Sequence, residues 1–156
     1  MDNVDKVIWV LPFLGLLDVI STLYAEGLGY SLALYEVGFF ARYFVGAGLA
    51  YIYIVIYLLG ISMVAYVLWY IKNKKLDCSL FFDKIIFLFL VGVTCYIYIR
   101  LTVAFVGNFL LRFFVSGRVS WFLVTLLTYL STASTLGFYL WRDVVAMVRA
   151  NGGEKE

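Results

Sequence analysis

The stretch that decides the fold is GLAYIYIVIYLLGISMVAYVLWYI, residues 48–71, which contains no charged side chain. An α-helix rises about 1.5 Å per residue, so about 20 apolar residues cross the hydrocarbon core of a bilayer. The stretch is therefore predicted to be a transmembrane helix.

Three further apolar runs have the length of a membrane span, at residues 7–26, 85–108 and 119–141. The sequence thus predicts an all-α, polytopic membrane protein with four transmembrane helices. We expect one four-helix domain over residues 1–148, followed by a short cytoplasmic tail over residues 149–156.

The composition excludes several kinds of protein. The 156 residues are 65% hydrophobic and only 14% charged, too few charges for the surface of a soluble domain of this size. The absence of His excludes histidine-ligated metals and Ser-His-Asp catalysis, and two Cys are too few for a thiolate zinc site. We therefore predict no metal, no cofactor and no catalytic residue. The basic run KNKK at 72–75 indicates membrane topology rather than nucleic-acid binding.

The Lys and Arg residues predict the orientation in the membrane. Eight of them flank the two termini and the loop between the second and third spans, whereas three lie on the opposite side. Because positive charge is retained in the cytoplasm, both termini are expected to be cytoplasmic in a multi-pass plasma-membrane protein.

The segment GLGYSLALYEVGFFARYFVGAG, residues 27–48, joins the first two spans. It is too polar and too rich in Gly for a lipid-facing span, yet more apolar than an ordinary loop. Its aromatic side chains suit the level of the lipid headgroups. We expect an interfacial helix or a re-entrant segment on the outer face.

Polar residues share one face of the first span. Asp18, Thr22 and Glu26 follow at steps of four, so they lie above one another on a helix. An ionised carboxylate costs roughly 2.5 to 3.5 kcal/mol near the centre of a membrane helix, so Asp18 is expected to face the helix assembly. Arg100, about 22 Å into the third span against about 18 Å for Asp18, is the expected ion-pair partner.

Further polar residues are predicted to converge on the same pocket. They are Glu36 and Arg42 of the outer segment, Asn108 near the end of the third span, and Thr128 of the fourth. The eight candidates could form one outer-leaflet pocket that binds an ion, a proton or a lipid headgroup. Alternatively, Asp18 and Arg100 could form a buried ion pair that only fixes helix register. The sequence leaves both interpretations open.

The order LLDVISTLYAEGLG, then YEVGFFARYF, resembles a family of small, uncharacterised prokaryotic membrane proteins. That family has an Asp and a Thr four apart in its first helix, a Glu-x-Asn-Pro-x-x-Arg stretch, and an Asn after the third helix. Matching residues here are Asp18, Thr22, Glu36, Arg42 and Asn108, whereas Gly38 and Phe39 stand in place of Asn-Pro. The resemblance implies a four-helix fold and a shared polar site, but no activity.

Three functions are compatible with these features. The favoured one is a small binding, transport or accessory subunit without enzymatic activity, in contact with membrane lipid and completed by a homodimer or a partner membrane subunit. The second is an intramembrane enzyme acting on a lipid or prenyl chain, with a carboxylate as acid or base and an Arg holding a phosphate. The third is a purely structural subunit of a larger complex. No nucleic-acid partner is expected.

Overall fold

The computed structural model describes residues 2–27, 43–44, 46–74, 76, 81–114 and 118–149. This part of the chain is all-α, with four long helices: α1 (Asn3–Gly27), α4 (Ala50–Lys74), α5 (Phe81–Phe114) and α6 (Arg118–Arg149). Each contains a segment long and apolar enough to cross a membrane. The prediction of four spans is confirmed.

Two helices are longer than the apolar runs that predicted them. The third span was predicted at 85–108, whereas α5 runs from Phe81 to Phe114, and α6 continues to Arg149 rather than to 141. Apolar composition marks only the part of a helix that lies in hydrocarbon, and the backbone hydrogen bonds continue beyond it. At about 1.5 Å per residue, α5 is about 51 Å long, against about 38 Å for α1 and for α4.

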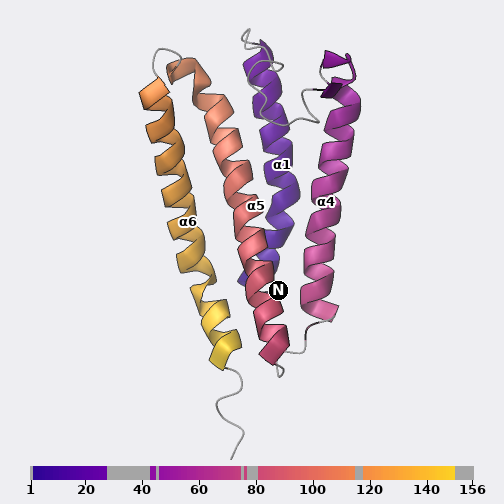
Figure 1. Ribbon diagram of the computed structural model, residues 1–156, viewed down its shortest axis with the longest axis vertical. Coiled ribbons are helices and arrows are strands. Elements are labelled where there is room, and N and C mark those ends of the chain that lie inside the picture. Colours follow the sequence, from indigo (N-terminus) through magenta and orange to yellow (C-terminus); the bar gives the residue numbers. More distant parts are fainter. Residues whose placement is uncertain are drawn as a thin grey trace, which may run out of the picture.

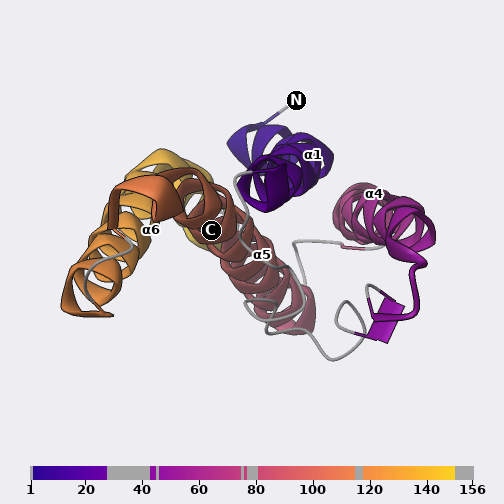
Figure 2. The same ribbon diagram turned by 90° about the horizontal axis from the view of Figure 1, so that it is seen from above.

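The four helices form an open row rather than a closed bundle (Figure 1). The view from above shows α4 and α6 at opposite ends of the row, with α1 and α5 between them (Figure 2). The most extensive contact is between α1 and α5; α6 packs mainly on α5, and α4 mainly on α1. The outer helices thus each have one principal neighbour.

The buried core follows the contact between α1 and α5. Val4, Ile8 and Leu11 of α1 are fully buried, and Phe87 and Leu90 of α5 are almost fully buried. By contrast, many large apolar side chains of α4 and α6 face outward, as hydrocarbon tails allow. The arrangement is that of a protein whose outer surface is solvated by lipid over the length of its helices.

One close approach fixes α4 on α1. A Cβ atom added to Gly15 would lie 2.7 Å from Cδ1 of Ile61. Gly15 is the middle residue of α1, and Ile61 adjoins the middle of α4. A glycine at this position lets the two antiparallel helices meet at mid-length.

The two ends of the chain are joined by hydrogen bonds. The backbone N–H of Asn3 donates to Oδ2 of Asp143 at 2.8 Å, and that of Val4 donates to the same atom at 3.2 Å. A helix N-terminus has unpaired donors and a partial positive charge, so a carboxylate there is favourable. We call the end of the row that holds these residues the terminal end.

The predicted outer segment, residues 27–48, is only partly within the described chain, since residues 28–42 and 45 lie outside it. Its described end leads into α4 through a turn in which Leu49 N–H donates to the carbonyl of Phe44 at 2.8 Å. Gly48 has φ of +73°, a conformation that suits glycine. The interfacial or re-entrant character of the segment stays a prediction.

Candidate functional site

The predicted polar face of the first span exists on α1 and points toward its neighbours. Ser21 is buried, and Asp18 and Thr22 are half-buried. The hydroxyl of Ser21 donates to the backbone carbonyl of Asp18 at 2.8 Å, which fixes its direction. These three residues form the α1 side of the site.

A tyrosine from α4 completes one side of the carboxylate. The hydroxyl of Tyr57 donates to Oδ2 of Asp18 over 2.6 Å, a distance typical of a charge-assisted O–H···O⁻ bond. Such bonds are about twice as strong as neutral ones. Asp18 is therefore held from α4 as well as from its own helix.

An asparagine from α5 completes the other side. Nδ2 of Asn108 lies 2.8 Å from Oγ1 of Thr22, 3.3 Å from Oγ of Ser21 and 3.4 Å from Oδ1 of Asp18. An amide nitrogen carries two hydrogens, so three acceptors share two donors. The bond to Thr22 is the short one, and the other two oxygens compete for the second hydrogen. We call Asp18, Ser21, Thr22, Tyr57 and Asn108 the Asp18 cluster.

A line of contacting aromatic rings runs along α4 to the cluster. Tyr57 stacks on Tyr53 with ring centroids 5.9 Å apart, and Tyr53 lies 6.0 Å from Phe44, which in turn contacts Tyr43 at 5.8 Å. Tyr53 and Tyr57 also have a further interaction each. The line of rings runs from the residues before α4 to Tyr57, whose hydroxyl bonds the Asp18 carboxylate.

A second aromatic pair lies between α1 and α5 beyond the cluster. Tyr24 and Phe109 stack with centroids 5.4 Å apart, and Phe105 contacts Phe109 at 6.2 Å. Aromatic and aliphatic side chains thus flank the polar cluster, and in such surroundings hydrogen bonds are stronger than in water.

No family model, no curated protein and no solved structure matches this chain. The resemblance found in the sequence stays a prediction. Of the residues that carry it, the structure brings Asp18, Thr22 and Asn108 together. Glu36 and Arg42 lie outside the described residues, and so does the side chain of Glu26.

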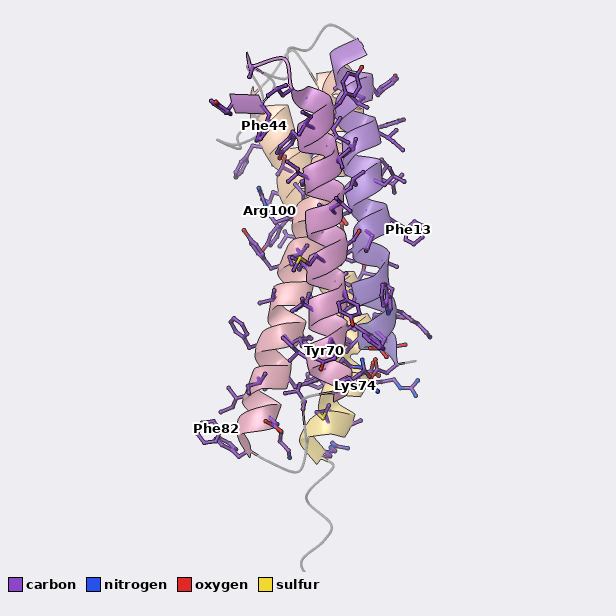
Figure 3. All side chains as sticks on the ribbon, turned by 90° about the vertical axis from the view of Figure 1, so that its right-hand side faces the viewer. Phe13, Phe44, Tyr70, Lys74, Phe82 and Arg100 are labelled. Atoms are coloured by element: carbon purple, nitrogen blue, oxygen red, sulfur yellow. The ribbon has the colours of Figure 1, made fainter. Side chains whose placement is uncertain are left out.

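The expected ion pair between Asp18 and Arg100 is not formed. Arg100 is exposed, and Figure 3 shows its side chain on the side of the row away from α1. The salt bridges between described residues instead join Lys72 to Asp2 and to Asp5. The rise per residue predicted the approximate depth of Arg100, but the direction in which a helix face points depends on tertiary packing.

Thr128 is also separate from the cluster. Its hydroxyl donates to the carbonyl of Val124 in its own helix at 2.8 Å. Ser131 and Thr135 bond back to α6 in the same way. These two and four other residues line a cavity of about 200 Å³ between α5 and α6: Tyr98, Thr102, Thr132 and Leu136. Ser131, Thr132 and Thr135 therefore lie at the α5–α6 contact.

The sequence did not predict the role of Tyr57, nor a second polar cluster at the terminal end. Nζ of Lys72 lies 2.6 Å from Oδ2 of Asp2 and 2.8 Å from Oδ1 of Asp5, and Asn73 Nδ2 donates to the same Asp5 oxygen at 2.9 Å. Lys72 and Asp5 are both buried. Their position was the available signal: Asp5 lies just before the first apolar run and Lys72 just after the second, at the same end of two antiparallel spans.

The described residues contain no group of three or more His, Cys, Asp or Glu side chains arranged to hold a metal ion. The Asp18 cluster instead offers one carboxylate that accepts hydrogen bonds from a phenol and an amide, and the same amide also donates to two hydroxyls. Such a set can accept, hold and release a proton.

Proposed function

We propose that this chain is a small membrane protein of the binding or transport class in which Asp18 takes up and releases a proton. The observation that carries the proposal is the 2.6 Å hydrogen bond from Tyr57 of α4 to Asp18 of α1, with Asn108 of α5 on the other carboxylate oxygen. One titratable group thereby joins three spans. In membrane helices such groups commonly mark proton and ion pathways.

A proton fits the cluster better than a lipid headgroup does. A headgroup phosphate would need a cation in the pocket; of the two arginines expected there, Arg100 points elsewhere and Arg42 lies outside the described residues. A proton needs no space and no movement of the backbone. The donors on Asp18 lower the cost of its charge, so that both protonation states can exist in the membrane.

Protonation would change the contacts between helices. An ionised Asp18 only accepts hydrogen bonds, whereas a protonated Asp18 also donates one. The bond from Tyr57 would then lose its charge assistance, and α4, which packs mainly on α1, would be held less tightly. Proton uptake is thereby coupled to the position of α4. A transport cycle requires a coupling of this kind between ligand binding and conformation.

The proposal includes an orientation. We place the chain in the plasma membrane with both termini in the cytoplasm, because the side that carries the excess of Lys and Arg is then the cytoplasmic side. Asp18 then lies in the outer half of the bilayer. Protons would reach it from outside, along the line of rings from Tyr43 to Tyr57.

The test uses purified protein reconstituted in vesicles that contain a pH-sensitive dye. An imposed pH gradient should decay faster with the wild type than with Asp18→Asn, which keeps the shape of the side chain and removes the titration. Asp83→Asn, at the start of α5, is the matched control and should behave as the wild type.

Two results would count against the proposal. The first is equal proton flux in the wild type and Asp18→Asn. The second is a sodium or potassium gradient that decays through the wild type while the pH gradient does not, which would assign another cation to the cluster.

A further inference from the structure

Contacts between helices place Arg100 at the middle of the membrane. Asn108 of α5 bonds Thr22 of α1, so the two residues lie at one level. The two helices run in the same direction (Figure 1). Arg100 is two turns, about 12 Å, closer to the terminal end than Asn108. It is therefore level with Leu14, next to Gly15, the middle residue of α1.

Figure 3 supports this depth, since Arg100 and Phe13 lie at nearly the same height on opposite sides of the row. Phe13 is 69% exposed, and Arg100 is exposed as well. Both side chains thus leave the protein at mid-membrane. For a phenylalanine this is favourable, and for an arginine it is not.

The guanidinium group of Arg100 has no acidic partner in the part of the chain that the structure describes. Asp18, the partner expected from the sequence, accepts hydrogen bonds from Tyr57 and Asn108 instead. The salt bridges between described residues are those of Lys72, at the terminal end. Arginine stays charged in proteins, so deprotonation does not remove the difficulty.

The energetic cost is large for so small a protein. Insertion scales assign roughly 2.5 to 3.5 kcal/mol to an Arg at the centre of a membrane helix, and simulations assign more. Snorkelling to headgroup phosphates relieves this cost near helix ends. From mid-membrane the phosphates lie beyond about 15 Å of hydrocarbon in either direction, farther than the side chain extends. Lipid alone does not offset this charge.

The face of α5 around Arg100 is shaped for a helix. Phe89, Gly92, Tyr96 and Arg100 follow at steps of three or four, and all four are exposed. A Cβ atom at Gly92 would meet nothing within 4 Å, so another backbone can approach there closely. We call these four residues the Arg100 face.

We propose that the Arg100 face binds a transmembrane helix of another subunit that carries an ionised Asp or Glu near its middle. The carboxylate pairs with Arg100, the Tyr96 hydroxyl supplies a hydrogen-bond donor beside it, and Gly92 accommodates the partner backbone. Intramembrane charges pair with one another across helix interfaces, which is the arrangement that removes the cost of both. This inference does not depend on proton binding by Asp18.

A second copy of this chain does not meet the requirement. Two-fold packing of the Arg100 face on itself would bring two arginines together at the same depth. Among the described residues, Asp18 is the acidic side chain closest to mid-membrane, and it is engaged in its own cluster. The described residues therefore offer no acidic group for Arg100 in a second copy, which favours a different chain as the source.

The test uses a probe helix of known sequence. A synthetic 23-residue polyleucine helix with one central Asp, flanked by lysines, is reconstituted with the full chain in vesicles of neutral phosphatidylcholine. Association is followed by energy transfer between dyes on the two molecules. The Asp helix should bind the wild type at least about tenfold more tightly than Arg100→Leu, as loss of a desolvated charge partner implies.

Three controls separate charge pairing from nonspecific association between hydrophobic helices. An all-leucine helix should not distinguish the wild type from Arg100→Leu. Arg100→Glu should instead prefer a helix with a central Lys. Phe138→Leu, on the exposed side of α6, should bind the Asp helix as the wild type does.

Arg100→Leu should also fold at least as well as the wild type in the absence of a partner, because it removes an unpaired charge from hydrocarbon. The proposal is overturned if the Asp helix binds Arg100→Leu as tightly as the wild type. It is equally overturned if Arg100→Leu loses thermal stability on its own, since Arg100 would then act within the chain. It is also overturned if anionic lipid binds in an Arg100-dependent way and the Asp helix does not.

Discussion

Asp143 of α6 caps the first turn of α1 across almost the whole chain, with its Oδ2 atom 2.8 Å from the backbone nitrogen of Asn3. The side-chain amide of Asn3 returns a bond to the carbonyl of Tyr139 at 3.2 Å. The first turn of α1 is thus capped by the last span as well as by Asp2, whose Oδ1 accepts from the Asp5 N–H at 2.9 Å.

Asp143→Ala should lower the thermal stability of the protein in detergent. A lost cap typically costs about 1 kcal/mol, and here two backbone donors lose their acceptor. Arg142→Ala, at the neighbouring exposed position, is the control and should leave the melting temperature unchanged. Equal melting temperatures for both variants would mean that water replaces the cap at no cost.

Lys72→Met should be the most destabilising of the single changes considered. It leaves the buried carboxylate of Asp5 without its cation, and breaking a buried pair costs on the order of 3 kcal/mol. Lys74→Met, at an exposed position two residues on, should cost little. The double variant Asp5→Leu with Lys72→Met should recover part of the lost stability, because it removes both charges. A double variant less stable than Lys72→Met would contradict this account.

Tyr57→Phe should destabilise the contact between α4 and α1 by about 2 kcal/mol, the range for a hydrogen bond to a charged group. In an Asp18→Asn background the same change should cost about half as much, since the acceptor is then neutral. Tyr66→Phe, at an exposed position on α4, is the control. Identical costs in both backgrounds would show that the Tyr57 hydroxyl does not interact with a charge.

Gly15→Val should separate α4 from α1, whereas Gly92→Val should not disturb the described fold. At Gly15 the new side chain would enter the space of Ile61, and at Gly92 it would meet open space. Overpacking of this kind typically costs about 1 to 3 kcal/mol. Ile61→Ala should partly rescue Gly15→Val, as measured by melting temperature; no rescue would place the strain elsewhere.

The sequence predicted the cluster from spacing and depth. Asp18 and Thr22 share a face because they are four residues apart, and Asn108 was included because it stands on the same stripe of the third span as Arg100. Tyr57 escaped prediction because it stands in YIYIVIY, where tyrosines usually face lipid or fill gaps. Which one of several tyrosines meets a carboxylate depends on the rotation of α4 about its axis.

Arg100 shows the limit of the same method. Its depth was counted from an expected start at 85, but α5 begins at Phe81 and extends past the terminal end of α1. Arg100 was expected about 4 Å farther out than Asp18, whereas it lies level with Leu14, about 6 Å on the terminal side of Asp18, and it points away from α1. Composition locates a span, but the neighbours of that span determine its register and its exposed face.

The unequal helix lengths have a consequence outside the bilayer. On one side of the row, α4 offers about 38 Å of helix, and on the other side α5 and α6 offer about 50 Å. The apolar spans differ less, at 25 residues in α4, 30 in α5 and 26 in α6, and a small difference in tilt accommodates them in one bilayer. The ends of α5 and α6 beyond these spans therefore project out of the hydrocarbon, where they are open to contact with water and with soluble molecules.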